Sequence, residues 1–382
     1  MPAAAMTQAI PFFPYAQVYL SEEEDLVSIF RDVGRRGAFI LQRDVQEFEE
    51  SLARFLGVRH AIGVANATDG LLIALRAAAA EAGGFAPGSE IIFSSHTRVA
   101  TAAAIHFAGC VPVPVECGAD HLMDPAAAEA AITPRTRAIL PTQLNGRVAD
   151  MAALGQLCSR HHLLLVEDAA QALGARFGDR CAGAFGAAAA FSFFPAKLLG
   201  CLGDGGAVVT NHSEIAARVT ELHDHGRGPD GEIRSWGLNS RLDNLQAAIL
   251  AHRLRGYGAV IERRRALAGA YDEQLRDLSE IALPPGPDCG DEHFDVYQNY
   301  EIEADRRDDL RAFLSRRGIG TLLPWGGKAV HQWDGLEFKI RLPRTEALFE
   351  RLLLLPMHTW LGEEQIAAIA GAVRDFYRGK HD

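Results

Sequence analysis

The sequence predicts an α/β protein with a mainly parallel sheet, helices on both faces of that sheet, and a second, smaller α+β lobe at the C-terminus. Short and almost wholly apolar runs alternate with longer helical segments between residues 60 and 211. Strands of that kind are typical of parallel sheets that are buried on both faces. The 382 residues also exceed what one hydrophobic core normally supports. We therefore expect a large domain over residues 1–250 and a small domain over residues 251–382.

The segments up to residue 211 support the larger part of this prediction. Residues 21–36 and 45–58 place apolar side chains at helical spacing, and Ser21 with Glu24 is expected to form a capping box at the first of these helices. The alternating region follows. Its expected strands are 60–66, 90–95, 111–116, 163–168, 187–194 and 206–211, and its expected helices are 68–82, 99–109 and 149–162.

The pattern changes after residue 250. Residues 252–278 predict one long amphipathic helix, rich in arginine and suited to joining two lobes. A loop is expected at 284–292, where proline and glycine gather. The remaining expected elements are a strand at 297–304 and helices at 307–319 and 363–377. This mixture indicates a small α+β lobe.

Composition and charge restrict the function classes. The formal net charge is −11, and no basic run is interleaved with aromatic residues, so a nucleic-acid partner is not expected. An anionic substrate would need a local basic patch. No apolar run approaches the roughly 20 residues that span a bilayer, and the N-terminus has no basic region before its short apolar segment. We expect a cytoplasmic protein without a membrane partner.

The cysteines argue in the same direction. Six are scattered along the chain, with no CxxC pair and no histidine at metal-ligand spacing. That spacing argues against a zinc site and against a disulfide framework, and it fits a reducing compartment. We therefore predict no metal site. The six are Cys110, Cys117, Cys158, Cys181, Cys201 and Cys289.

Lys197 is the most informative residue, because it stands among apolar and glycine residues in AAAAFSFFPAKLLGCLGDGGAVVT. A buried ammonium is costly unless it is paired or loses its proton. Upstream, the apolar run of an expected strand ends in Glu167 and Asp168. A partly neutral lysine that forms a Schiff base, with a carboxylate that keeps a pyridine nitrogen protonated, is what pyridoxal phosphate chemistry requires. Taken singly, Lys197 also suits a lysine that reaches out to water, and Asp168 suits a helix cap.

Other candidate residues lie around this pair in the chain. The loop from Asn66 to Asp69 opens directly into a helix, whose N-terminal amides suit a phosphate, and the Thr68 hydroxyl would add a donor. Alternatively, Thr68 or Asp69 caps that helix. Ser192 is either a phosphate ligand or an ordinary strand hydroxyl, and Gln171 carries little signal alone. The order of these residues, with Asp168 and Lys197, predicts a pyridoxal phosphate enzyme.

Four segments with their flanks resemble the DegT/DnrJ/EryC1/StrS aminotransferases, a family of sugar aminotransferases. The segments are ITPRTRAILPTQLNGRVADM, VEDAAQALGA, FSFFPAKLLGCLGDGGAVVTN and GLNSRLDNLQAAIL, and the similarity extends over residues 37–377. The resemblance implies the fold-type I architecture of pyridoxal-phosphate-dependent transferases, with a seven-stranded type of sheet.

The resemblance also implies a role for each matching residue. Lys197 matches the Schiff-base lysine, Asp168 the partner of the pyridine nitrogen, and Gln171 the side chain near the cofactor's 3-hydroxyl. Thr68 and Ser192 match phosphate-binding positions. Asn239 matches an asparagine that reaches the phosphate held by a neighbouring subunit, which implies a homodimer with a shared active site.

This sequence departs from the family pattern at several positions. Arg98 stands where an aromatic residue usually stacks on the cofactor ring, and a guanidinium there would stack, bind a substrate anion, or simply face the surface. Ala67 replaces a common glycine, and Gln298 replaces a frequent histidine. Residues 321–332 also differ from the histidine-tyrosine-proline motif that is often found there in the family. These positions border the cofactor and substrate, so the resemblance does not identify the particular sugar.

The expected activity is ping-pong transamination, in which L-glutamate leaves the cofactor as pyridoxamine phosphate and a keto sugar then receives the nitrogen. The sugar is expected to be a nucleotide-linked keto-deoxysugar. Transfer from glutamine to a cyclic keto-polyol is an alternative. A dehydratase that uses pyridoxamine phosphate is disfavoured, because such relatives carry histidine where Lys197 stands. A non-catalytic regulator is disfavoured by the presence of both Lys197 and Asp168.

Overall fold

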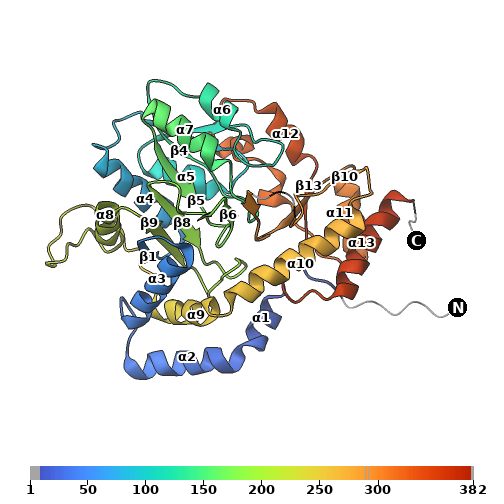
Figure 1. The fold of residues 1–382 in the computed structure, drawn as a ribbon, viewed down its shortest axis with the longest axis horizontal. Coiled ribbons are helices and arrows are strands. Elements are labelled where there is room, and N and C mark those ends of the chain that lie inside the picture. The colour runs from blue at the N-terminus through green and yellow to red at the C-terminus, as the bar shows by residue number, and fades with distance from the viewer. Residues whose placement is uncertain (1–8, 289, 291, 380–382) are drawn as a thin grey trace.

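A computed structural model describes residues 9–288, 290 and 292–379, and a large α/β body and a smaller lobe follow one another in it (Figure 1). The body contains a seven-stranded sheet in the order β1-β9-β8-β5-β4-β2-β3. β9 is antiparallel to both of its neighbours, and the other strands run parallel to one another. The strands are β1 (His60–Val64), β2 (Glu90–Ser94), β3 (Val111–Val115), β4 (Thr136–Leu140), β5 (Leu164–Asp168), β8 (Ala188–Ser192) and β9 (Gly206–Thr210). The mainly parallel sheet is confirmed.

Helices cover both faces of this sheet, because successive residues of each strand point to opposite sides. Ala189 and Val209 pack in one core, whereas their neighbours Ala190 and Val208 pack in the other. The first core contains residues of α3 (Arg43–Leu56) and α7 (Met151–His161), and the second contains residues of α4 (Ala67–Glu81), α5 (Val99–Phe107) and α8 (Ser213–His223).

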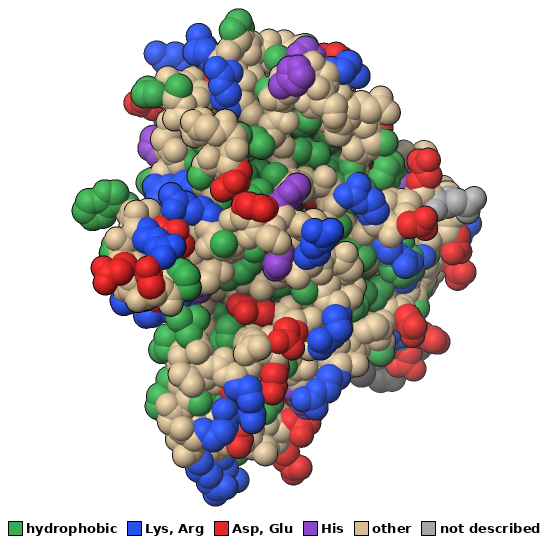
Figure 2. Space-filling view, turned by 60° about the vertical axis from the view of Figure 1, so that its left-hand side comes forward, with side chains coloured by type: hydrophobic (Ala, Val, Ile, Leu, Met, Phe, Trp, Pro, Cys, Tyr) green, Lys and Arg blue, Asp and Glu red, His purple; other side chains and the backbone are tan. Residues whose placement is uncertain are grey.

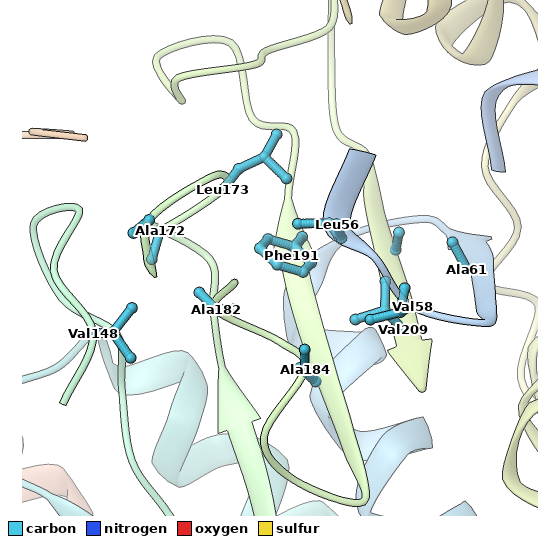
Figure 3. Packing of buried hydrophobic residues seen from close by; sticks show 14 of the residues in the cluster. Leu56, Val58, Ala61, Val148, Ala172, Leu173, Ala182, Ala184, Phe191 and Val209 are labelled. Atoms are coloured by element: carbon cyan, nitrogen blue, oxygen red, sulfur yellow. The ribbon is translucent and has the colours of Figure 1, made fainter. Parts of the chain in front are cut away.

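The first core is packed closely around Phe191 of β8, which is almost fully buried. Figure 3 shows its ring among Leu56, Leu173 and Ala182. The packing leaves no room at Gly183, where an added Cβ would lie 2.8 Å from the ring. This core therefore fixes β8, the strand that leads into the Lys197 loop.

The small lobe is built on an antiparallel sheet in the order β10-β12-β13, formed by Ile281–Ala282, Tyr300–Ala304 and Leu352–Leu355. Its core joins these strands to α10 (Tyr257–Leu275), α11 (Arg307–Arg316) and α13 (Glu363–Tyr377). α10 runs from the large body across to this lobe (Figure 1). Strand β13 lies in an all-leucine run for which no strand was predicted.

Several shorter elements complete the described chain. A third small sheet has the order β11-β6-β7. The remaining elements are α1 (Tyr15–Ser21), α2 (Glu23–Arg36), α6 (Pro125–Ala130), β6 (Arg176–Phe177), β7 (Arg180–Cys181), α9 (Asn244–Leu254), β11 (His293–Phe294), three 3-10 turns (Pro324–Gly327, Val330–Gln332, Asp334–Leu336) and α12 (Pro343–Phe349). The loop predicted at 284–292 contains positions 289 and 291, which lie outside the described residues.

Two contacts join segments from opposite ends of the chain. Ile10 forms a parallel bridge with Ile319 and is part of the small-lobe core. Farther along, α12 packs onto the large body, where the Arg344 guanidinium donates to Asp124 at 2.6 Å. The division between residues 1–250 and 251–382 stays a prediction, and these contacts cross it.

Two local predictions were wrong. Ser21 does not cap α2: it is the last residue of α1, and its hydroxyl donates to the carbonyl of Val18. The continuous helix expected over 252–278 is broken, because α9 ends at Leu254 and α10 begins at Tyr257. Gly256 lies at the break, and glycine is the weakest helix former after proline. Helical periodicity persists on both sides, so it did not reveal the interruption.

Within the described residues, no helix is both long and apolar enough to cross a membrane. Figure 2 shows Lys and Arg side chains interspersed with Asp and Glu over the face that it presents.

Candidate active site

The candidate active site is centred on Asp168, the last residue of β5. Its side chain is 4% exposed and accepts two hydrogen bonds. The Thr101 hydroxyl donates to Oδ2 at 2.6 Å, and the Ala170 amide donates to Oδ1 at 3.2 Å. Burial raises the pKa of Asp168, although these hydrogen bonds and the charge of Lys197 oppose the shift. A raised pKa means that these interactions do not fully offset the desolvation of the charged carboxylate, and a cation beside it would stabilise that charged form.

A chain of threonine hydroxyls supports Asp168. Thr101 donates its only hydroxyl proton to the carboxylate, so it accepts from Thr97 at 2.8 Å, and Thr97 in turn accepts from Thr142 at 2.8 Å. All three threonines are buried. No sequence pattern pointed to Thr101, because its contact with Asp168 joins α5 to the end of a separate strand, β5. The network fixes the orientation of the Asp168 carboxylate.

Lys197 lies in the loop between β8 and β9, and Gln298 holds that loop on both sides of it. The Leu198 amide donates to Gln298 Oε1 at 2.9 Å, and Gln298 Nε2 donates to the Ala196 carbonyl at 2.9 Å. Arg264 is almost fully buried and donates to the Gln298 carbonyl at 3.1 Å. The small lobe therefore positions the lysine loop. Gln298 was noted in the sequence only as a departure from histidine.

The Lys197 amine has a lowered pKa. Desolvation lowers it most, the Asp168 carboxylate opposes that shift, and the Arg98 guanidinium lowers it further, to about 8. The structure thus brings these three charged side chains within electrostatic range of one another. With this pKa about a tenth of the lysine is neutral at pH 7, far more than for an ordinary lysine, and only the neutral amine is a nucleophile or base.

Arg98 is exposed at the N-cap position of α5, and its side chain does not cap the helix. Of the three alternatives that the sequence left open, surface exposure describes its position in a single chain. Its influence on the pKa of Lys197 also places its charge at the edge of the site.

The N-terminus of α4 presents donors beside β8 and β9. Asn66, rather than Thr68 or Asp69, caps the helix: its side chain accepts from the Asp69 amide, and its carbonyl accepts from Gly70. Capping by Thr68 or Asp69 was therefore the wrong alternative. Across the described residues, the Thr68 hydroxyl has no hydrogen-bond partner, so the Thr68 side chain and the first amides of α4 remain available to an anion.

The backbone around this helix start is closely packed. A Cβ at Gly206 would lie 2.7 Å from the carbonyl carbon of Asn66 and 2.9 Å from the amide nitrogen of Ala67. Ser192, which pairs with Gly206 across β8 and β9, is partly exposed, and its hydroxyl accepts from the Phe194 amide at 3.4 Å. Ala67, Thr68 and Ser192 thus belong to neighbouring elements at one end of the sheet.

Gln171 and Asn239 lie in different surroundings. The Gln171 side-chain oxygen accepts from the Asn145 amide at 2.8 Å, so its nitrogen is the end that can donate to a ligand. Asn239 is exposed on the segment that follows α8, where it forms a bridge with Asp224. The structure of a single chain therefore does not join Asn239 to the Lys197 and Asp168 pair.

A cavity of about 570 Å³ lies against the lysine loop. Lys197 is on its wall together with Arg253, Arg264 and Trp360, whereas Asp168 and Ser192 are not. This cavity is therefore distinct from the space in which Asp168 and Lys197 would share a ligand.

The donor set fits pyridoxal phosphate. Asp168 is a carboxylate whose pKa is raised by burial, and a protonated pyridine nitrogen beside it would stabilise its charged form. Lys197 supplies an amine with a pKa of about 8 for the aldehyde. The first turn of α4 supplies donors for the phosphate.

Comparison with known proteins agrees with this chemistry. A dTDP-3-amino-3,4,6-trideoxy-alpha-D-glucose transaminase of Streptomyces venezuelae is 39% identical over 98% of this chain and 98% of its own length. A UDP-N-acetyl-3-dehydro-alpha-D-glucosamine 3-aminotransferase of Acidithiobacillus ferrooxidans is 37% identical over 98% of this chain and 100% of its own length. The crystal structure of S. venezuelae DesV in complex with a ketimine intermediate has a TM-score of 0.91, 39% identity, and coverage of 97% and 99% of the two chains.

The likeness to DesV confirms the fold-type I architecture that the sequence predicted. The model of the DegT/DnrJ/EryC1/StrS aminotransferase family matches residues 20–374, so the chain belongs to that family. The protein is accordingly an aminotransferase of a family that uses pyridoxal phosphate.

Proposed function

We propose that this protein transfers the amino group of L-glutamate to carbon 3 of a nucleotide-linked 3-keto sugar, with pyridoxal phosphate held by Lys197. The observation that carries the proposal is the placement of the Lys197 amine, with its pKa of about 8, in range of the buried Asp168 carboxylate. The names of the two relatives, each of which aminates carbon 3 of a nucleotide sugar, support the substrate class.

Bound pyridoxal phosphate would supply the electron sink for the substrate's α-carbon. Asp168, oriented by Thr101, would hold the proton on the ring nitrogen. Lys197 would take the proton from the α-carbon of the amino donor, and in the half-reaction with the keto sugar it would give a proton to the sugar carbon that receives nitrogen. General acid–base catalysis of this kind contributes about 10²–10⁴-fold. Gln298 would keep the lysine backbone in place while its side chain moves.

The phosphate would bind at the first turn of α4. The amides at Ala67 and Thr68, the Thr68 hydroxyl and the Ser192 hydroxyl would donate to it. Gln171 would donate through its amide nitrogen to the 3-hydroxyl of the ring, because its oxygen is engaged by Asn145. Arg98 would bind an anionic group of the substrate at the edge of the site.

A homodimer would complete this site. Asn239 is exposed in the single chain, and large apolar side chains are exposed near it and beside the lysine loop, with Trp236 95%, Phe194 46% and Leu202 43% exposed. We propose that a second copy covers them and that Asn239 reaches the phosphate held by the other subunit.

A mixing experiment tests the shared site. Lys197→Ala should be inactive and Asn239→Ala only weakly active, and a mixture that has exchanged subunits should recover up to about a quarter of the wild-type rate. Half of the dimers are then mixed, and each mixed dimer holds one intact site. If Asn239 acts within its own subunit, the mixture recovers nothing.

The activity itself is tested with the holoenzyme and L-glutamate, against nucleotide-linked 3-keto and 4-keto sugars and a cyclic keto-polyol. Mass spectrometry of the amine product should find amination of the 3-keto sugar, and L-glutamine serves as the comparison donor. Product formed only from glutamine and the cyclic keto-polyol would contradict the proposed substrate.

A further inference from the structure

A second cluster of charged side chains lies between the large body and the small lobe. It consists of His96 in the loop after β2, His121 in the loop after β3, and Glu301 and Glu303 on the same face of β12. One ligand atom from each of His96, His121 and Glu301 lies within 4.8 Å of the other two. The mechanism proposed above uses none of these side chains.

His96 has a buried ring nitrogen without a hydrogen-bond partner. The residue is 1% exposed, and its Nδ1 lies 3.2 Å from the carbonyl oxygen of His121, so Nδ1 carries the proton. Nε2 has no hydrogen-bond partner among the described residues, yet it lies 3.4 Å from Glu301 Oε2. In the neutral ring, Nε2 would direct a lone pair at a buried carboxylate. A positive charge, either a proton or a metal ion, must therefore lie between these two atoms.

His121 is oriented in the same manner. Its Nδ1 lies 2.9 Å from Glu301 Oε1, while its Nε2 lies 3.2 Å from Glu303 Oε1. Histidines that bind metals almost always donate their second ring N–H to a carbonyl or a carboxylate, which fixes the ring. Here His96 Nδ1–H would donate to the His121 carbonyl, and His121 Nε2–H would donate to Glu303.

We propose that His96 Nε2, His121 Nδ1 and the Glu301 carboxylate bind one divalent transition-metal ion, for which Zn²⁺ is the best match. Two imidazole nitrogens and one carboxylate are a common set of three protein ligands for zinc, with water as the fourth. Ligands at zinc bond lengths in a tetrahedron lie about 3.3 Å apart. The His96 to Glu301 and His121 to Glu301 separations of 3.4 and 2.9 Å are close to that value.

Sequence spacing did not reveal this site, and the prediction of no metal site rested on that spacing. The three ligands are contributed by residues 96, 121 and 301, from two lobes. A bound ion would join the two lobes. The ion would also be connected to the active site through hydrogen bonds. Glu301 Oε1 accepts from the Asn145 side chain at 2.9 Å, and the backbone amide of Asn145 donates to the Gln171 side chain.

Protons compete with the metal for this site. Burial opposes protonation, but Glu301 outweighs it and raises the pKa of His96 to about 9, and Glu301 with Glu303 raises that of His121 to about 10. The Cys117 thiol beside His96 acts in the same direction, and Arg351 faces Glu303. Metal binding must therefore release protons, and the affinity should increase as the pH rises toward 9.

The test measures Zn²⁺ binding to the holoenzyme by calorimetry in metal-free buffers between pH 7 and 9, with metal content by mass spectrometry. The wild-type chain should bind one Zn²⁺ with proton release. His121→Gln and Glu301→Gln should each lose about 100-fold or more in affinity, and Glu303→Gln about 10–100-fold, as expected for the partner of a ligand. His223→Gln is the matched control, because His223 is a buried histidine on α8, outside the cluster, whose Nδ1 lies 2.6 Å from the carbonyl oxygen of Thr220.

Lys197 and Asp168 are unchanged in every variant, so zinc bound by the cofactor would be equal in all of them. Equal binding by the wild type, Glu301→Gln and His223→Gln would therefore overturn the proposal. So would the absence of Zn²⁺ binding by the wild type at pH 9, because the positive charge beside His96 would then be a proton. Neither outcome depends on transaminase activity.

Discussion

Glu167 and Asp168 are neighbours at the end of the same buried strand, and their surroundings differ sharply. Glu167 is fully buried and accepts four hydrogen bonds, from Gln143 Nε2 and from the amides of Gly183, Phe185 and Gly186. Asp168 points to the other face of the sheet and accepts two, from Thr101 and Ala170. Burial raises the pKa of both carboxyl groups.

The two neighbouring carboxylates at this strand end therefore have different roles. The hydrogen bonds of Glu167 go to the backbone of residues 183–186, so this carboxylate holds a loop in place. Asp168 has fewer donors and lies in range of Lys197, so it retains capacity for a cationic ligand. Removing Glu167 should cost stability, whereas removing Asp168 should cost activity. The variants that follow test this separation.

Lys197→Ala should have the largest effect. It removes the covalent anchor and the base together, so we expect the rate of transamination to fall by more than about 10⁴-fold. The melting temperature of the cofactor-free chain should not fall, because a partly buried amine is lost without a cavity in either core. Turnover above a tenth of the wild-type rate would contradict the assignment.

Asp168→Asn should come next, with a loss of about 10³-fold in kcat and weaker cofactor retention, because the protonated ring nitrogen loses its counter-charge. Single-turnover kinetics with L-glutamate and a titration with pyridoxal phosphate would measure the two effects. Kinetics close to those of the wild type would remove the distinction between the two carboxylates.

Glu167→Gln should reverse this pattern. An amide nitrogen would face backbone donors that now have a carboxylate, so we expect a loss of about 1–3 kcal/mol in the free energy of unfolding. The cofactor spectrum and kcat of the folded fraction should change by less than about tenfold. Urea unfolding beside steady-state kinetics makes the comparison, and a variant as stable as the wild type but inactive would show that Glu167 has a direct role in the site.

The smallest expected effect is a shift in pH dependence. The pKa of Lys197 is about 8, so the rate at which the cofactor-free chain binds pyridoxal phosphate covalently should rise with pH through that value, as the amine becomes neutral. Arg98 lowers this pKa and Asp168 raises it. The midpoint should therefore move up in Arg98→Gln and down in Asp168→Asn. Stopped-flow absorbance would detect the shifts, and movement of both midpoints in the same direction would contradict the charge arrangement.

The features that the sequence predicted well are those that one segment determines. Apolar strands, helical spacing and the end of β5 place Asp168 and Lys197 at one end of a parallel sheet, where side chains from separate strands meet. The extent of α13 follows from its own periodicity. The electrostatic influence of Asp168 and Arg98 on Lys197 is therefore a consequence of topology.

The features that were missed join segments far apart in the chain. Thr101 reaches Asp168 from another element, and Gln298 reaches the lysine loop from the small lobe. The cluster of His96, His121 and Glu301 depends on how two lobes meet. Local competition explains the remaining errors: Asn66 precedes Thr68 and takes the cap position, and the helical pattern continues across the break at Gly256.

The most direct test of the account is chemical. Reduction of the holoenzyme with borohydride, followed by digestion and mass spectrometry of the peptides, would locate the residue bonded to the cofactor. We expect one label per chain, on Lys197, and none in Lys197→Ala. A label on another lysine, or an unlabelled wild-type chain that still turns over, would contradict the claim that Lys197 carries the cofactor.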